Sequence, residues 1–184
     1  MKTLILNGSP RPKGDTASLL QIFTDHIKGE YKIVNAYRCH ISPCIDCRYC
    51  WENDGCAIKD EMQEVYDYIQ ECDNVLIASP VYFAELTGKM LDLGSRLQTY
   101  SSAKLFRKEE AVKKAKRGAV LLAGGGSGGV ERAYETARML LHCVNCRDIH
   151  EVVSCRNTDK VPGIEDREAL DGVKKIIAFF EENR

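Results

Sequence analysis

The chain carries almost no net charge and no long apolar run, and both absences restrict what it can bind. Its 184 residues include 26 Lys and Arg against 27 Asp and Glu, so the formal net charge is −1. Nucleic-acid binding depends on a basic excess on one face, and this balance gives it no support. No segment approaches the roughly 18 consecutive apolar residues of a transmembrane helix, so we expect neither a nucleic-acid nor a membrane partner.

Features of an exported protein are also missing. The N-terminal sequence MKTLILNGSPRPKG has one apolar run, from Leu4 to Leu6, which is far shorter than the hydrophobic region of a signal peptide. We therefore expect a cytoplasmic protein, in which the nine cysteines would mostly be thiols or metal ligands rather than disulfides. The four histidines are scattered and form no HExxH or triad pattern, so a hydrolytic site is not predicted.

What the chain does contain is a regular alternation of short apolar runs and amphipathic segments. Five strands are predicted, at residues 2–7, 30–38, 74–80, 117–126 and 147–155. Five helices are predicted between and after them, at residues 17–29, 58–73, 87–100, 129–146 and 165–183. This order predicts a doubly wound parallel α/β sheet. The length favours one domain over residues 1–184, with a cysteine-rich insert at about residues 39–58.

The segment NGSPRPKGDT joins the first predicted strand to the first helix, at the sheet edge where open α/β folds bind ligands. Ser9 and Thr16 supply hydroxyls, and Arg11 and Lys13 supply positive charge. The start of the helix, which Thr16 or Asp15 would cap, adds free backbone N–H groups. Helix capping alone would explain Thr16 but not the Ser-Pro-Arg before it, so the segment predicts an anion site. It is neither a Walker loop nor G-x-G-x-x-G.

A second glycine-rich segment, AGGGSGGVE, follows the fourth predicted strand. Gly124, Gly126 and Gly129 have the G-x-G-x-x-G spacing of a dinucleotide-binding loop. Only one strand follows it, which is too little chain for the βαβ array of such a domain. Two interpretations remain: a loop whose backbone N–H groups approach a ligand at the same sheet edge, or a turn without a ligand.

The insert contains a compact cysteine motif. Cys44, Cys47, Cys50 and Cys56 read C-x2-C-x2-C-x5-C. Four closely spaced thiolates are the ligand set of an iron–sulfur cluster such as 4Fe–4S, whereas structural zinc usually uses two separated pairs. A cysteine-rich loop without a metal is the third interpretation, and the spacing leaves all three open.

The loop GSPR-x-x-G-x-T resembles the FMN phosphate loop of the NADPH-dependent FMN reductase and iron–sulfur flavoprotein group, within the flavodoxin-like fold. The segment ASPVYFAELTGKM is similar to that family's SPVY segment, and a glycine-rich loop follows the fourth strand in both. The resemblance covers the whole chain. It implies a three-layer sandwich with a five-stranded parallel sheet in the order 2-1-3-4-5.

The resemblance also implies which residues bind FMN. The phosphate would meet the first loop, the isoalloxazine ring would be wrapped by the segment after the third strand, and its pyrimidine end would face the glycines. The residues expected to bind FMN are Ser9, Arg11, Lys13, Gly14, Asp15, Thr16, Pro80, Val81, Tyr82, Phe83, Gly124, Gly125 and Gly126. The family usually has Asn where Asp15 stands. The second segment suits a flat heterocycle because it offers backbone groups and two aromatic faces.

The four-cysteine motif resembles the cluster motif of iron–sulfur flavoproteins. Cluster-free members of the same family also carry C-x2-C-x2-C followed by Trp and a later Gly-Cys, as in Cys50-Trp51 and Gly55-Cys56. In those members the loop would cover the flavin or a subunit interface.

The resemblance implies an FMN-dependent NAD(P)H oxidoreductase, with a quinone, a flavin, a nitro or azo compound, or a protein as the electron acceptor. No catalytic side chain is expected, because the cofactor supplies the reacting atom, flavin N5. The alternatives are a non-enzymatic electron carrier between protein partners and a metal-binding module without flavin. Family likeness also implies a homodimer or homotetramer.

Overall fold

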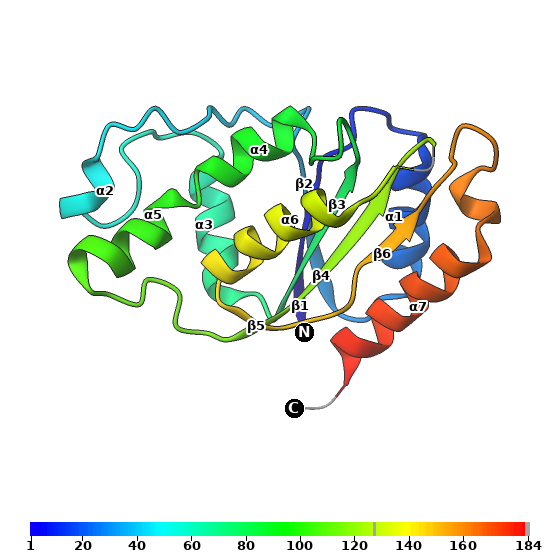
Figure 1. Cartoon of the computed structure of the whole chain (residues 1–184). Helices are drawn as coiled ribbons and strands as arrows, with labels where there is room; N and C mark the ends of the chain where they lie inside the picture. The colour runs from blue at the N-terminus through cyan, green and yellow to red at the C-terminus, as the bar shows by residue number, and fades with distance from the viewer. Residues whose placement is uncertain (127, 183–184) are drawn as a thin grey trace.

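The apolar runs assemble side by side in one parallel sheet. The computed structural model describes residues 1–126 and 128–182, and within them the strands are β1 (Lys2–Asn7), β2 (Glu30–Asn35), β3 (Asn74–Pro80), β4 (Lys116–Ala123), β5 (Cys146–Ile149) and β6 (Val153–Cys155) (Figure 1). Their order is β2-β1-β3-β4-β5, and β6 also pairs with β4. The predicted fold class and the order of the first five strands are confirmed.

The predicted strand over residues 147–155 is two strands in the structure. β5 pairs with the start of β4, where Gly118 lies opposite Ile149, and β6 pairs with its end, where Leu121 lies opposite Val153. The register therefore slips by one residue between the two, as in a β-bulge. The polar pair His150 and Glu151 interrupts the apolar run at this point. The predicted count of five strands is thus wrong: the described residues form six.

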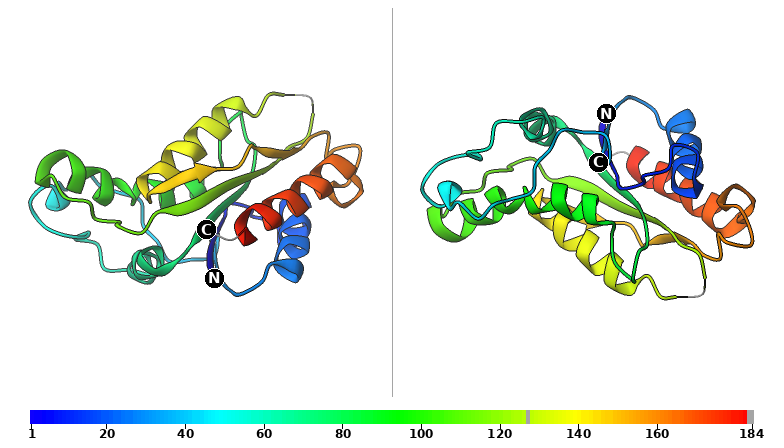
Figure 2. Two further views of the ribbon diagram at one scale, coloured as in Figure 1. Left: turned by 90° about the horizontal axis from the view of Figure 1, so that it is seen from below. Right: turned by 90° about the horizontal axis from the view of Figure 1, so that it is seen from above.

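Helices cover both faces of the sheet. They are α1 (Asp15–His26), α2 (Tyr49–Glu52), α3 (Met62–Glu71), α4 (Gly88–Ser95), α5 (Gln98–Ser102), α6 (Glu131–Cys143) and α7 (Arg167–Glu181), with a π-helical turn η1 (Ala103–Arg107) and a 3-10 turn η2 (Gly163–Glu165). Figure 2 shows α1 and α7 together on one face, and α3, α4 and α6 on the other.

Each face of the sheet has its own apolar core. On one face, Phe23 of α1 and Phe180 of α7 meet edge to face, with ring centroids 6.1 Å apart. On the other face, Ile69 of α3, Met90 of α4 and Leu141 of α6 are fully buried. Burial on both faces explains why the strands are continuous apolar runs rather than alternating ones.

The start of α1 differs from the prediction. Gly14 is the N-cap residue, and no side chain of the described residues caps that turn. Asp15 is the first helical residue, and its Oδ1 instead accepts a hydrogen bond from the backbone N–H of Gly163 at 2.9 Å. Thr16 is buried. Asp15 therefore connects the first loop to η2, a long-range contact that the local sequence does not reveal.

The helix predicted over residues 87–100 is broken into α4 and α5. The break falls at Arg96 and Leu97, whose side chains are buried. The segment between β2 and α3 runs above α4 and α5 in Figure 1 before it turns at α2. Within residues 1–126 and 128–182, no helix has the length and apolar character to traverse a lipid bilayer.

Candidate functional site

Loops from four strand ends meet in a groove at the carboxyl edge of the sheet. One hollow is lined by Ser9, Arg11, Asp15, Thr16, Pro80, Val81, Tyr82, Ala123, Gly124, Gly125 and Thr158. An adjoining hollow shares Val81, Gly124 and Gly125 and adds Phe83, Ala84, Gly126, Gly128, Gly129, Val130 and Arg156. We call the two hollows together the carboxyl-edge groove. It brings together all three segments that the sequence singled out for FMN.

The first loop packs directly on the loop after β3. A Cβ atom added to Gly8 would lie 2.8 Å from Oγ of Ser79 and 3.0 Å from Oγ1 of Thr87, so only glycine fits there. The hydroxyl of Thr87 donates to the carbonyl oxygen of Gly8 at 2.8 Å. Ser9 is buried, and its Oγ donates to the carbonyl oxygen of Arg11 at 3.2 Å. These contacts fix the turn that presents Arg11.

Positive charge in this loop lies at the mouth of the groove. The Arg11 side chain is 70% exposed, and its Nη2 lies 3.9 Å from Oδ2 of Asp15. Because the other oxygen of Asp15 is bound to Gly163, the carboxylate is held at the side of the loop. Thr16 and the free N–H groups of the first turn of α1 complete a site suited to an anion. Lys13 is exposed, and neither Lys13 nor Gly14 is among the described residues that line the groove.

The loop after β3 makes a tight turn at the groove. Tyr82 and Glu85 exchange backbone hydrogen bonds of 2.9 and 3.0 Å. The two residues between them, Phe83 and Ala84, have left-handed φ angles of 53° and 61°, the conformation of a type I′ turn. The Phe83 side chain is fully exposed, whereas Tyr82 is 44% exposed. The turn therefore holds an aromatic side chain out over the adjoining hollow.

The loop after β6, which was not predicted from the sequence to be part of the site, supports the glycine-rich loop. The N–H of Thr158 donates to the carbonyl oxygen of Gly124 at 3.2 Å, and the N–H of Gly126 donates to Oδ1 of Asp159 at 2.9 Å. The hydrogen bond from Gly126 holds the pKa of Asp159 below its ordinary value. Arg156 and Thr158 themselves line the groove. In the sequence, the polar run RNTD, which directly follows the last predicted strand, could have indicated that these residues reach the groove.

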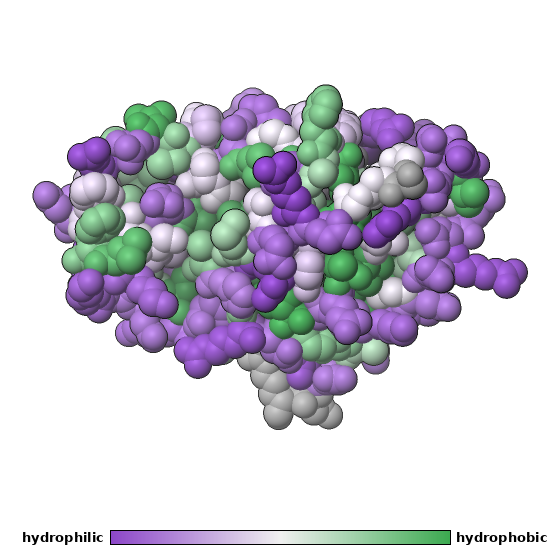
Figure 3. All heavy atoms as spheres, viewed as in Figure 1, coloured by the Kyte–Doolittle hydropathy of each residue, from purple (hydrophilic) through white to green (hydrophobic). Residues whose placement is uncertain are grey.

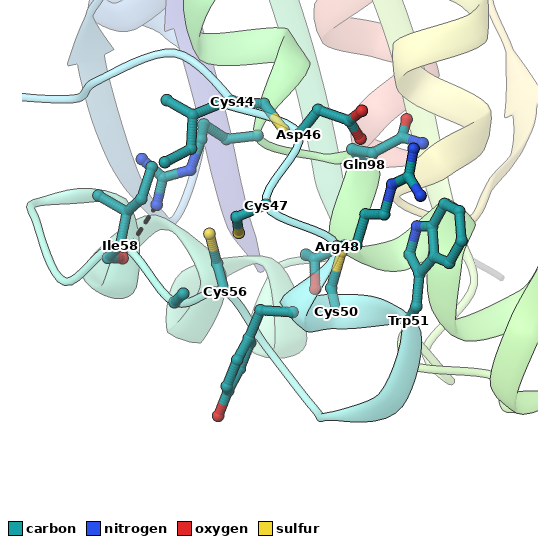
Figure 4. Close-up of a pocket in the computed structure, with 14 residues that line it drawn as sticks. Cys44, Asp46, Cys47, Arg48, Cys50, Trp51, Cys56, Ile58 and Gln98 are labelled. Carbon is teal, nitrogen blue, oxygen red and sulfur yellow. Dashed lines mark hydrogen bonds between the residues drawn. The ribbon is translucent and has the colours of Figure 1, made fainter.

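The four motif cysteines line a separate hollow, which we call the cysteine hollow (Figure 4). Cys44 and Cys47 are exposed, Cys50 and Cys56 are half-buried, and all four are free thiols. Figure 4 shows the sulfur atoms of Cys47 and Cys56 next to one another, with Cys44 above them and Cys50 to their right. Among the described residues, no group of three or more His, Cys, Asp or Glu side chains is arranged to hold a metal ion. The four cysteines therefore line one hollow, but their side chains are not arranged as the ligands of a metal ion.

Arg96 anchors both ends of this loop from the junction of α4 and α5. Its Nη1 donates to the carbonyl oxygen of Ser42 at 2.9 Å and to Oδ2 of Asp60 at 2.8 Å, and its Nη2 donates to the carbonyl oxygen of Ile58 at 3.1 Å. The last of these bonds is dashed in Figure 4. The side chain is fully buried, and Nε has no hydrogen-bond partner among the described residues.

The charges of this pair stabilise one another. Burial is the largest effect and acts to lower the pKa of Arg96, but the hydrogen bond to Asp60 and the nearby Tyr66, Cys56 and Asp60 side chains together leave the pKa above its ordinary value. Burial likewise acts to raise the pKa of Asp60, but hydrogen bonds from Arg96 and from the backbone N–H groups of Ser42 and Met62 hold that pKa below its ordinary value. Arg96 and Asp60 are thus an ion pair at the base of the cysteine loop.

A second arginine holds the tip of the loop. Arg107 of η1 donates to the carbonyl oxygens of Cys50 and Asn53, the latter at 2.9 Å. The guanidinium carbon of Arg48 lies 4.8 Å from the centroid of the Trp51 ring. Although Cys44 and Cys47 are exposed, the turn that carries Cys50 is therefore fixed to the body of the protein.

An open parallel sheet in the order β2-β1-β3-β4-β5, with helices on both faces, defines a flavodoxin-like protein. A model of the family described as NADPH-dependent FMN reductase matches residues 1–159, and the chain belongs to this family of FMN-dependent NAD(P)H oxidoreductases. It resembles two iron–sulfur flavoproteins of Methanocaldococcus jannaschii. One is 31% identical over 74% of this chain and 68% of the relative.

The other is 31% identical over 52% of this chain, and the match spans only 51% of that relative's own length. Among solved structures, the NAD(P)H:quinone oxidoreductase of Methanothermobacter marburgensis is similar with a TM-score of 0.74 and 17% identity, over 100% of this chain and 98% of that one. At this identity the likeness supports the flavodoxin-like fold.

Proposed function

We propose that this protein binds FMN in the carboxyl-edge groove and acts as an NAD(P)H-dependent oxidoreductase with a small-molecule electron acceptor. One observation carries the proposal: the anion-suited first loop, the segment after β3 and the glycine-rich loop line one continuous groove. Family membership supports the choice of FMN and of a nicotinamide as electron donor.

Each segment has a task in this proposal. Ser9, Arg11 and Thr16, with the free N–H groups of α1, would bind the phosphate of FMN. Backbone groups of Pro80 and Val81, with the Tyr82 ring, would hold the flat ring system. The glycine-rich loop, held in place by Asp159, would let its backbone N–H groups approach the ring edge. Bound FMN supplies the hydride and electron chemistry, so the protein contributes binding and orientation.

A matched pair of variants tests the phosphate site. Arg11 lines the groove, and Lys13 is an exposed cation two residues away that does not. We expect Arg11→Ala to weaken FMN binding about tenfold or more through loss of a charge-assisted contact, and Lys13→Ala to change it little. Titration of the apoprotein with FMN, followed by flavin fluorescence, measures both. Equal affinities for Arg11→Ala and the unsubstituted protein would contradict the assignment.

Turnover distinguishes an enzyme from a carrier. Steady oxidation of NADH or NADPH by the purified, FMN-loaded chain with an added quinone or azo compound is the expected result. No turnover with any small acceptor, together with rapid reduction by a ferredoxin, would instead support an electron carrier between protein partners.

The cysteine hollow favours a second candidate function, that of an iron–sulfur flavoprotein. Four thiols line one hollow, and a buried arginine nitrogen beside it lacks a partner among the described residues. This donor set fits a 4Fe–4S cluster in chemistry, and curated relatives are named iron–sulfur flavoproteins. Cys44, Cys47, Cys50 and Cys56 would hold the cluster after a rearrangement of the exposed part of the loop. A bound cluster supplies single-electron transfer.

The visible spectrum and iron content of anaerobically purified protein test this candidate. About four irons per chain and a broad shoulder that bleaches with dithionite would support a cluster. Absence of iron after anaerobic reconstitution would contradict the iron–sulfur function. A Cys47→Ala variant with an unchanged spectrum would also contradict it.

Self-association is a further part of the proposal, as a homodimer or homotetramer. Apolar side chains are exposed at the end of the molecule that carries α2 and η1 (Figure 3). They include Ile45, Tyr49, Leu105 and Phe106. Light scattering coupled to gel filtration would measure the mass, and a monomer at micromolar concentration would contradict this part.

A further inference from the structure

We propose that Arg96 is a positioning residue for the cysteine hollow, whose guanidinium holds both ends of the loop and offers its Nε–H to the anionic group that the four cysteines bind. This inference rests on the iron–sulfur function proposed above. It assigns to Arg96 two effects that can be separated: closure of the loop, and hydrogen bonding with positive charge at the bound group.

The first support is the geometry of loop closure. The guanidinium bonds to Ser42, which lies before the cysteine motif, and to Ile58, which lies after it. Both contacts are to backbone carbonyl oxygens, so they hold the path of the chain rather than particular side chains. Next to Arg96, the Oγ of Ser95 accepts a hydrogen bond from the N–H of Cys44 at 2.9 Å. The end of α4 therefore sets where the cysteine segment begins and ends.

The second support is an unsatisfied buried donor. Three bonds leave Nη1 and Nη2, but Nε has no partner in the described part of the chain, although the side chain has no exposed surface. Buried arginine donors are normally satisfied, and an exception calls for an explanation. Arg96 itself lines the cysteine hollow. A group bound there would supply the missing acceptor.

The third support is charge. Four thiolates around iron make a negatively charged group, and hydrogen bonds and charges near the sulfur atoms set its reduction potential. Arg96 is the cation that lines the hollow without exposure to solvent, whereas Arg48 also lines it but is exposed. A buried cation at this place stabilises the more negative, reduced form and so raises the potential.

Three variants of the full chain, reconstituted anaerobically with iron and sulfide, separate these effects. Arg96→Gln removes the charge, Arg96→Lys keeps the charge but removes Nε–H, and Asp60→Asn loosens the same closure from outside the hollow. The readouts are iron per chain, FMN content as a measure of the intact fold, and the potential from spectroelectrochemical titration.

We expect Arg96→Gln to lower the potential or to lose iron while FMN content is kept. Arg96→Lys should lower the potential by a smaller amount. Asp60→Asn should move the potential in the opposite direction, because it removes a negative charge next to Arg96. If Arg96 only held the loop in place, the reduction potential should change in the same direction in the Arg96 and Asp60 variants.

Two results would overturn the proposal. One is wild-type iron content and potential in both Arg96 variants, and the other is a shift of the same sign in Arg96→Gln and Asp60→Asn. If Arg96→Gln does not fold, as loss of FMN would reveal, an unchanged potential in Arg96→Lys still overturns the role of Nε. If the unsubstituted protein binds no iron, both the iron–sulfur function and the role of Arg96 are wrong. If it binds iron and the Arg96 variants do so with an unchanged potential, only the role of Arg96 is wrong.

Discussion

The ring of Phe106 lies almost parallel to that of Trp51, with ring centroids 4.1 Å apart and 19° between the planes. Trp51 is the one tryptophan of the sequence, and it follows Cys50 directly. Its fluorescence therefore reports on the cysteine loop and on the contact of that loop with η1.

The stacked pair predicts how that fluorescence responds to substitution. Phe106→Ala should expose Trp51, shift its emission to longer wavelength and destabilise the turn at α2 by about 0.5–1.5 kcal/mol, the usual range for an aromatic pair. Leu105→Ala is the matched control, because Leu105 is the exposed neighbour of Phe106 and has no aromatic ring to stack on Trp51. An unchanged emission spectrum for Phe106→Ala would contradict the stacking.

A second prediction concerns the contact between the first loop and the loop after β3. Gly8→Ala would place a methyl group 2.8 Å from Oγ of Ser79 and 3.1 Å from Cβ of Met90, so we expect a loss of about 1–3 kcal/mol from overpacking. Gly88 begins α4, and a Cβ there would meet no described atom within 4 Å beyond its own helix and chain neighbours. Gly88→Ala should therefore be neutral or stabilising. Urea unfolding measures both, and equal midpoints would rule out the close approach.

The depressed pKa of Asp60 predicts a pH dependence of stability. A carboxylate whose pKa is lower in the folded state stabilises the fold above its ordinary pKa of 3.8, and the contribution is lost as pH falls through the folded value. Asp60→Asn should thus lower stability by about 1–3 kcal/mol near pH 7, with the difference shrinking as pH falls below 3.8 and vanishing only below the lower pKa of the folded state. Unfolding curves of both proteins across this range provide the check; a difference that stays constant with pH would contradict the ion pair.

The left-handed turn after β3 predicts a stabilising substitution. Ala84 has a φ of 61°, a conformation that costs an L-residue about 1–2 kcal/mol and glycine much less. Ala84→Gly should therefore stabilise the protein by up to about 1 kcal/mol. In contrast, Ala178→Gly at an exposed position of α7 should destabilise it by about 1 kcal/mol. Thermal unfolding of the two variants should give shifts of opposite sign.

Local pattern was sufficient for the strands and for most of the carboxyl-edge groove. Runs such as NVLIASP coincide with β3 because burial on both faces demands continuous apolar residues. Loops that follow parallel strands meet at one edge of the sheet. For this reason the sequence was enough to predict that Ser9, Val81 and Gly124 lie in one groove.

What the sequence did not predict depends on contacts between distant segments. Asp15 was expected at a helix cap, but its carboxylate is bound to Gly163 near the other end of the chain. The burial of Arg96 follows from its bonds to Ser42 and Ile58, which no periodicity reveals. Whether the cysteine motif holds a cluster was left open by its spacing for a similar reason, since the spacing does not determine how the loop folds back on α4.

The closure made by Arg96 has a consequence for how such chains diverge. Because Ser42 and Ile58 are held at the same guanidinium, the segment between them is a closed loop attached at its two ends to Arg96, between α4 and α5. The entropy of closing a loop grows only slowly with length, by about 0.6 kcal/mol for each doubling. Insertions and deletions between these anchors therefore add little closure entropy, and their cost lies in the contacts that Ser95 and Arg107 make with the loop rather than in the flavodoxin-like sheet.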